Sequence, residues 1–115
     1  MAVEGQIEGG AQMGLGYALT EELIVKDGKV LNPDLLDYRL FTSADMPIIE
    51  TRIIETDDPG GPFGAKGVGE MGGTPTAAAI ANAIYDAVGV RMTQLPMTPE
   101  RVLAALDEKE KRARV

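Results

Sequence analysis

The sequence has no cysteine, no histidine and no tryptophan. Without cysteine it can form no disulfide framework, hold no thiolate-bound zinc or iron–sulfur cluster, and offer no thiol nucleophile. Without histidine it has no imidazole base, no Ser-His-Asp triad and no imidazole ligand for a metal. Any catalysis must therefore depend on Asp, Glu, Lys, Arg, Tyr, Ser or Thr, or on a bound cofactor.

Aromatic residues and positive charge are also scarce. The 115 residues include two Phe and three Tyr, and 18 acidic against 11 basic residues give a net charge of −7. Such a chain is a poor nucleic-acid binder. No apolar run approaches the roughly 18 residues that a membrane span needs. The acidic N-terminal segment lacks the apolar core of a signal peptide, so we expect a cytoplasmic protein that contacts neither nucleic acid nor membrane.

Glycine, in contrast, is abundant. It occupies 14 of 115 positions, well above the average frequency of about 7%. Many of the glycines and prolines lie in residues 32–47 and 57–73, which predict irregular structure. Segments of this length are uncommon in a small domain unless they are functional or pack against another body. We therefore expect the chain to be part of a larger structure.

The apolar pattern of the first half predicts a helix, a hairpin and a strand. Apolar residues recur at helical spacing over residues 6–21, where Ile7 and Leu15 share one face. Within residues 22–31, the segments Leu-Ile-Val and Lys-Val-Leu flank Asp27-Gly28, which is a strong signal for a tight hairpin. The β-branched segment 48–56 predicts a strand with both faces partly covered. So thin a sheet again indicates that other strands complete it.

The second half predicts a glycine-rich loop and two helices, which makes the fold class α+β. After the loop at 57–73, Thr74 is expected to cap a helix with Pro75 at its first position and Gly89 at its end. The apolar face of this helix contains Ala77, Ile80, Ala81, Ile84 and Val88. The segment Thr98-Pro99-Glu100 begins a last helix. We expect one unit over residues 1–106 and a frayed, charged tail over 107–115.

The glycine loop leaves two interpretations open. Residues 67–72 fit G-x-G-x-x-G literally, but no strand leads directly into them, so a dinucleotide site is not expected. Lys66 is followed by Gly67 instead of the Ser or Thr of a P-loop. The loop is either a tight connection or a concave anion site, in which backbone N–H groups and the charge of Lys66 face the ligand.

Three polar positions are candidates for chemistry. Glu70 lies among glycines near a helix start, where loss of water could make a carboxylate a useful general base. Alternatively, it is a solvated residue that interacts with the helix dipole. The amide of Gln6 can donate and accept hydrogen bonds but alone indicates nothing. The pair Asp57-Asp58 fits a solvated turn better than a site for a hard cation. Tyr17 is interpreted as a packing residue.

Four segments in order resemble the molybdenum hydroxylases, the family of xanthine dehydrogenase and aldehyde oxidase. They are GQIEGG at 5–10 with GLGYALTEE at 14–22, GPFGAKGVGE at 61–70, AIANAIYDA at 79–87, and LPMTPERVL at 95–103. The resemblance extends from about residue 3 to about residue 106. It implies the C-terminal part of the molybdopterin-binding subunit of an oxidoreductase that hydroxylates a small molecule. The chain would then be a partial domain of a larger molybdenum-binding fold.

The resemblance also implies roles for single residues. Glu70 matches the family's active-site glutamate, the general base, and Gln6 matches the glutamine that hydrogen-bonds the pterin. The backbone that lies against the cofactor corresponds to Lys66, Gly67, Val68 and Gly69. No residue of this chain is expected to bind the metal, because the pterin dithiolene holds it.

The implied cofactor is molybdenum–molybdopterin, shared with the remainder of the subunit, which lies upstream. Iron–sulfur clusters and FAD would belong to partner subunits or domains. The isolated chain is then expected to be inactive. The alternative hypothesis is a non-catalytic remnant or assembly module that retains the family fold and binds partner subunits.

Overall fold

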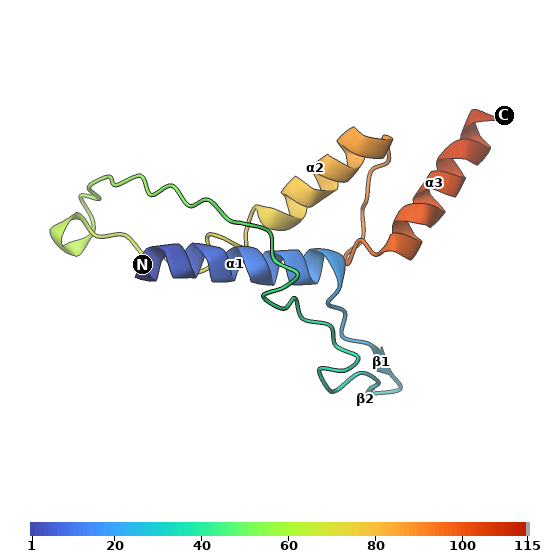
Figure 1. The fold of residues 1–115 in the computed structure, drawn as a ribbon, viewed down its shortest axis with the longest axis horizontal. Coiled ribbons are helices and arrows are strands. Elements are labelled where there is room, and N and C mark those ends of the chain that lie inside the picture. The colour runs from blue at the N-terminus through green and yellow to red at the C-terminus, as the bar shows by residue number, and fades with distance from the viewer. Residues whose placement is uncertain (115) are drawn as a thin grey trace.

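The computed structural model describes residues 1–114. In that range it contains three α-helices, one short 3₁₀ helix and one two-stranded hairpin (Figure 1). In chain order the elements are α1 (Ala2–Leu19), β1 (Val25–Lys26), β2 (Lys29–Val30), η1 (Pro62–Gly64), α2 (Thr76–Val88) and α3 (Pro99–Ala113). None of these helices is both long enough and apolar enough to cross a membrane.

Helix α1 runs along the centre of the molecule, and α2 packs beside its C-terminal half (Figure 1). The predicted helix at 6–21 is confirmed, although it begins at Ala2 and ends at Leu19. A Cβ atom added at Gly14 would lie 2.6 Å from the Thr76 Cβ. Glycine at this position therefore allows the start of α2 to approach the α1 backbone closely.

Helix α2 is confirmed, but its N-terminus differs from the prediction. Pro75 is the N-cap residue, and the hydroxyl of Thr74 instead donates to the Glu70 carbonyl at 3.3 Å. Gly89 ends the helix as predicted, with the left-handed φ of 68° that glycine adopts readily. Most of the predicted apolar face is half-buried, namely Ala77, Ile80, Ala81 and Ile84, whereas Val88 is exposed.

Helix α3 begins as predicted, because the Thr98 hydroxyl accepts a hydrogen bond from the Arg101 N–H at 3.4 Å. The helix then continues through Ala113, so the expectation of a frayed tail is wrong for residues 107–113. The pairs Glu108–Arg112 and Glu110–Arg114, one helical turn apart, support this exposed end at 3.7 and 3.4 Å. The domain boundary at residue 106 stays a prediction.

The hairpin is confirmed at its predicted place. Val25 pairs with Val30 and Lys26 with Lys29 across the turn. Asp27 and Gly28 both have positive φ, 50° and 75°, as a two-residue hairpin turn of type I′ requires. The short strands are exposed on both sides.

The predicted strand at 48–56 is wrong for this structure. Residues 47–56 have no regular secondary structure, and the sheet within residues 1–114 contains β1 and β2 alone. Ile48 and Ile54 are 95% and 81% exposed. A β-branched sequence favours extended backbone, but a strand forms only when a neighbouring strand accepts its hydrogen bonds.

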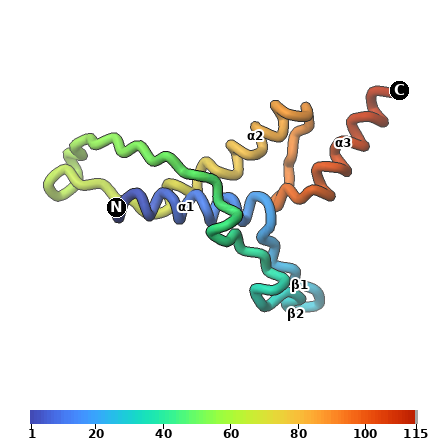
Figure 2. Tube along the Cα trace, viewed as in Figure 1, coloured from blue at the N-terminus to red at the C-terminus, as the bar shows by residue number. Residues whose placement is uncertain are grey.

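The described chain has little core of its own. Its buried hydrophobic residues are Ala18, Val90 and Met97. The radius of gyration is 18.2 Å, against about 13 Å for a compact domain of this length. The accessible surface is 8937 Å², against roughly 6,100 Å² for a compact protein of this mass. The hairpin and α3 project away from α1 as separate arms, whereas the segment before η1 runs alongside α1 toward its N-terminal end (Figure 2).

Candidate functional site

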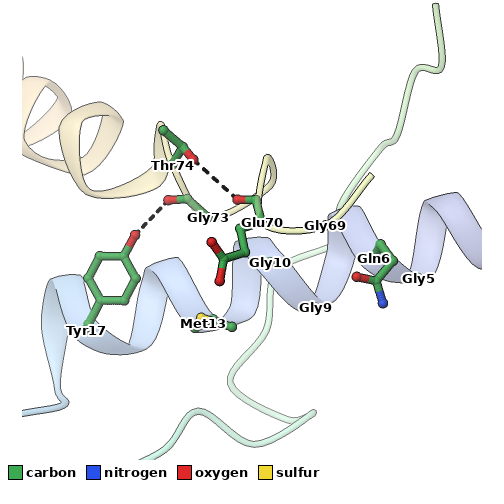
Figure 3. Close-up of a pocket in the computed structure, with 10 residues that line it drawn as sticks. All are labelled: Gly5, Gln6, Gly9, Gly10, Met13, Tyr17, Gly69, Glu70, Gly73 and Thr74. Atoms are coloured by element: carbon green, nitrogen blue, oxygen red, sulfur yellow. Dashed lines mark hydrogen bonds between the residues drawn. The ribbon is translucent and has the colours of Figure 1, made fainter. Parts of the chain in front are cut away.

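A pocket of about 540 Å³ lies where the loop before α2 crosses helix α1. Its volume is within the range of small-molecule and cofactor sites. Figure 3 shows the lining residues, which come from α1 and from the end of the glycine-rich loop. They are Gly5, Gln6, Gly9, Gly10, Met13, Tyr17, Gly69, Glu70, Gly73 and Thr74.

The pocket glycines of α1 serve two different purposes. A Cβ added at Gly10 would lie 3.0 Å from both the Gly72 Cα and the Gly73 N, so Gly10 lets the loop rest on the helix. By contrast, apart from the adjoining backbone of α1 itself, no atom lies within 4 Å of the Cβ positions of Gly5 and Gly9. These two residues are one helical turn apart and therefore share a face. They leave an open cradle of bare backbone in the pocket wall.

The loop side of the pocket presents Glu70. Its carbonyl oxygen accepts hydrogen bonds from the Gly73 N–H at 3.0 Å and from the Thr74 N–H at 3.3 Å, which closes a turn. The carboxylate lies over α1, between Tyr17 and Gln6 (Figure 3). The side chain is exposed, so the described chain holds Glu70 in place without excluding water from it.

Tyr17 belongs to the site, although the sequence predicts it to be a packing residue. Its hydroxyl donates to the Gly73 carbonyl at 2.7 Å and so joins α1 to the loop that carries Glu70 (Figure 3). A signal for this role was present in the sequence. Gly5, Gly9, Met13 and Tyr17 recur every four residues, which places them along one face of a helix.

The structure brings together only some of the predicted cofactor-binding residues. Gln6, Gly69 and Glu70 share the pocket. Lys66, Gly67 and Val68 line a different depression, together with residues 52–57 and the start of α1. The Lys66 ammonium donates to the Thr56 hydroxyl there, so in this structure its charge is not directed at Glu70.

Outside the pocket, hydrogen bonds at the C-terminal end of α1 join the rest of the chain to this helix. Arg101 contacts the Glu22 carboxylate at 2.7 Å and donates to the Pro96 carbonyl at 2.8 Å. The Met97 N–H donates to the Ala18 carbonyl at 2.6 Å. The Tyr38 hydroxyl donates to Glu21 at 2.8 Å, and this hydrogen bond raises the pKa of Tyr38.

The described residues offer no protein-built metal site. No group of three or more Asp, Glu, His or Cys side chains within residues 1–114 could hold a metal ion. In the Asp57-Asp58 segment, the Asp58 carboxylate accepts from the Gly60 N–H at 2.9 Å and the Asp58 N–H donates to Gly64 at 3.1 Å. This arrangement is a turn, as the sequence predicts.

Known proteins match the chain along most of its length. Residues 1–47 match the family of the molybdopterin cofactor-binding domain. The chain is 45% identical over 104 residues to the xanthine dehydrogenase molybdenum-binding subunit of Escherichia coli O157:H7, which covers 89% of this chain and 14% of that protein. It is 42% identical over 106 residues to the aldehyde oxidoreductase molybdenum-binding subunit PaoC of E. coli K12, with coverage of 90% and 14%.

The chain belongs to the xanthine dehydrogenase and aldehyde oxidase family of molybdenum hydroxylases. A solved member, quinoline 2-oxidoreductase from Pseudomonas putida 86, superposes with a TM-score of 0.83 and is 37% identical. That match covers 92% of this chain and 14% of the solved chain. The chain thus corresponds to a C-terminal part of a molybdenum hydroxylase and spans about 14% of the relatives that it matches.

Only one of the two halves of the pocket lies within the residues that match the molybdopterin cofactor-binding domain. Helix α1, with Gln6 and the open cradle, lies inside residues 1–47, which match the molybdopterin cofactor-binding domain. The loop with Gly69 and Glu70 lies beyond those residues. Its assignment to the site therefore depends on the pocket geometry.

Proposed function

We propose that this chain supplies the general base and part of the cofactor wall of a molybdenum hydroxylase that acts on a small molecule. The observation that carries the proposal is the shared pocket of Gln6 and Glu70, beside the open cradle of Gly5 and Gly9. The amide and the accessible backbone there can bind a cofactor, and the carboxylate can accept a proton. The matched relatives are named as molybdenum-binding subunits of xanthine dehydrogenase and aldehyde oxidoreductase.

The residues present fit a pterin cofactor. A pterin is flat and has hydrogen-bonding edges, so it suits a cradle with no side chains and one neighbouring amide. Gln6 would pair with the pterin edge, and Gly69 would let the loop backbone approach it closely. We assign the backbone of Lys66, Gly67 and Val68 to the same wall in the complete subunit. When bound, molybdenum–molybdopterin supplies the redox chemistry of the hydroxylation, and the chain itself need not ligate the metal.

Glu70 is the proton acceptor in this proposal. Its carboxylate takes the proton from the oxygen nucleophile as that oxygen attacks an electron-poor carbon of the substrate. The backbone turn of Glu70, Gly73 and Thr74 fixes where the carboxylate enters the pocket. The rest of the subunit would cover the exposed side of Glu70, which strengthens electrostatic interactions by excluding water.

The exposed surface supports large partner contacts. The chain exposes roughly 2,800 Å² more than a compact protein of its mass. Covering this excess would bury roughly twice that area over both partners, which is as large as an obligate interface. We assign this surface first to the remainder of the molybdopterin-binding subunit. Partner subunits or domains with iron–sulfur clusters and FAD would then carry the electrons away from the molybdenum site.

The decisive experiment replaces Glu70 in the complete, molybdenum-loaded enzyme. Glu70→Gln keeps the shape of the side chain but cannot accept a proton. Turnover per molybdenum, assayed with xanthine and with an aromatic aldehyde, should fall by roughly 10²–10⁴-fold. Molybdenum content should remain that of the parent, and the acid limb of the pH–rate profile should disappear. Glu50→Gln, at an exposed carboxylate outside the pocket, is the matched control.

The result also separates the two hypotheses for the chain. If Glu70→Gln retained turnover within about threefold of the parent, well below the usual effect of a general base, the assignment of Glu70 would be wrong. If the chain copurified with larger subunits but without molybdenum or activity, it would instead be a non-catalytic assembly module. The large exposed surface is the observation that favours this second candidate.

A further inference from the structure

We propose that Tyr17 is a positioning residue that holds the Glu70 loop in its working geometry. The proposal rests on the function proposed above for Glu70. It starts from one hydrogen bond, in which the Tyr17 hydroxyl donates to the Gly73 carbonyl at 2.7 Å. The two residues are far apart in sequence and meet at the edge of the pocket (Figure 3).

The hydrogen bond of Tyr17 is linked to Glu70 through one turn of the backbone. Gly73, whose carbonyl is held by Tyr17, donates its N–H to the Glu70 carbonyl at 3.0 Å. The Thr74 N–H and hydroxyl donate to the same carbonyl, each at 3.3 Å. The backbone of Glu70 is therefore fixed relative to α1 through Gly73 and Tyr17.

The composition of this loop explains why it needs an anchor on the helix. Gly72 and Gly73 are consecutive, and glycine has more backbone freedom than any other residue. A Cβ added at Gly72 would lie 2.5 Å from the Ile7 carbonyl oxygen, so the loop can rest on α1 only without side chains. Hydrogen bonds must then supply the restraint that side-chain packing provides elsewhere. The Thr76 hydroxyl restrains Gly72 at 2.9 Å, and Tyr17 restrains Gly73.

The test uses Tyr17→Phe in the complete, molybdenum-loaded enzyme, because this change removes only the hydroxyl. Amide hydrogen exchange of residues 70–76 should accelerate by about two- to tenfold, the range expected for one lost hydrogen bond. Turnover per molybdenum should fall by a similar factor. The KM for xanthine and the molybdenum content should not change, since Gln6 and the cradle remain intact. Tyr38→Phe removes a tyrosine hydrogen bond to Glu21, outside the pocket, and should alter none of these values.

A double variant determines whether Tyr17 acts through Glu70. In the Glu70→Gln background, adding Tyr17→Phe should leave turnover unchanged, because the group that Tyr17 positions is already inactive. A further fall in the double variant would overturn the proposal, as would parental hydrogen exchange and turnover in Tyr17→Phe alone. If Glu70→Gln itself were fully active, the proposed function would fail and the positioning role would fall with it. Low activity of Glu70→Gln beside full activity of Tyr17→Phe would reject the positioning role alone.

Discussion

Replacing Gly9 with alanine should stabilise helix α1 but weaken cofactor binding. Alanine is favoured over glycine in a helix interior by about 1 kcal/mol. Apart from the adjoining backbone of α1 itself, no atom lies within 4 Å of the position that the new Cβ would occupy, so the described chain accommodates the methyl group without strain. In cofactor-free enzyme, helix α1 should therefore become more stable. The same methyl group would, however, fill part of the cradle where we place the pterin.

The two effects have different magnitudes and can be measured separately. Overpacking a tightly filled site by one methyl group costs about 1–3 kcal/mol, which corresponds to about 5- to 150-fold in affinity. Enzyme produced with limiting molybdate should accordingly contain much less molybdenum, as measured by elemental mass spectrometry. Amide hydrogen exchange of residues 2–19 in cofactor-free enzyme should slow at the same time.

Gly10→Ala provides the neighbouring control, since its Cβ would press on Gly72 and Gly73 at 3.0 Å. It should accelerate hydrogen exchange in the Glu70 loop even without cofactor, because it displaces the loop and not the ligand. If Gly9→Ala loaded molybdenum as fully as the parent enzyme, the open cradle would not be part of the cofactor wall.

Three further outcomes are expected. Gln6→Ala should lower molybdenum content more than turnover per bound molybdenum, the reverse of Glu70→Gln; equal loss of both quantities would contradict the division of roles. The isolated 115-residue chain should bind no molybdenum tightly and show no hydroxylase activity, because most of the cofactor wall lies outside it; near-stoichiometric molybdenum in the purified chain would refute this. The isolated chain should also self-associate and bind dyes for apolar surface, given exposed side chains such as Ile48, Ile54 and Phe63; a clean monomer by light scattering at high concentration would count against it.

The elements that the sequence predicted correctly depend on local signals. Asp27-Gly28 determines a hairpin through its backbone preferences, Gly89 ends α2, and Thr98 caps α3 with its own hydroxyl. Each signal acts within a few residues, so no knowledge of the tertiary structure was needed. The predicted cap at Thr74 is not formed: its hydroxyl donates to the Glu70 carbonyl, and no side-chain oxygen accepts from the first N–H groups of α2.

Whether residues 48–56 form a strand cannot be decided from these residues alone. Their β-branched sequence is compatible with a sheet, but strand formation depends on hydrogen-bonding partners elsewhere. In the described chain those partners are absent, and the segment remains irregular and exposed. The same dependence on distant segments explains why the sequence indicates only a packing role for Tyr17. Its acceptor, Gly73, lies at a distant point in the sequence.

The candidate site was predicted through resemblance and not through spacing. Nothing in the local sequence indicates that Gln6 and Glu70 share a pocket, and the glycine loop alone allowed two interpretations. The geometry supports a shared site for Gln6, Gly69 and Glu70 and leaves Lys66 beside Thr56. Only the structure shows which α1 glycines contact another segment and which face open space, because the identity of a residue does not reveal what lies opposite it.

The described chain forms a defined pocket although its overall shape is open, and the contacts around the pocket explain why. The pocket is built from contacts that this chain makes with itself: Gly10 against the loop, and Tyr17 with Gly73. Its geometry therefore does not require the remainder of the subunit. Exclusion of water from Glu70 does require it, because the carboxylate is exposed in the described chain. Under the proposed function, this segment determines where the base lies, and the surrounding subunit determines how strongly the base is shielded. Substitutions within the chain should then change the orientation of Glu70, whereas substitutions on the covering surface should change its reactivity.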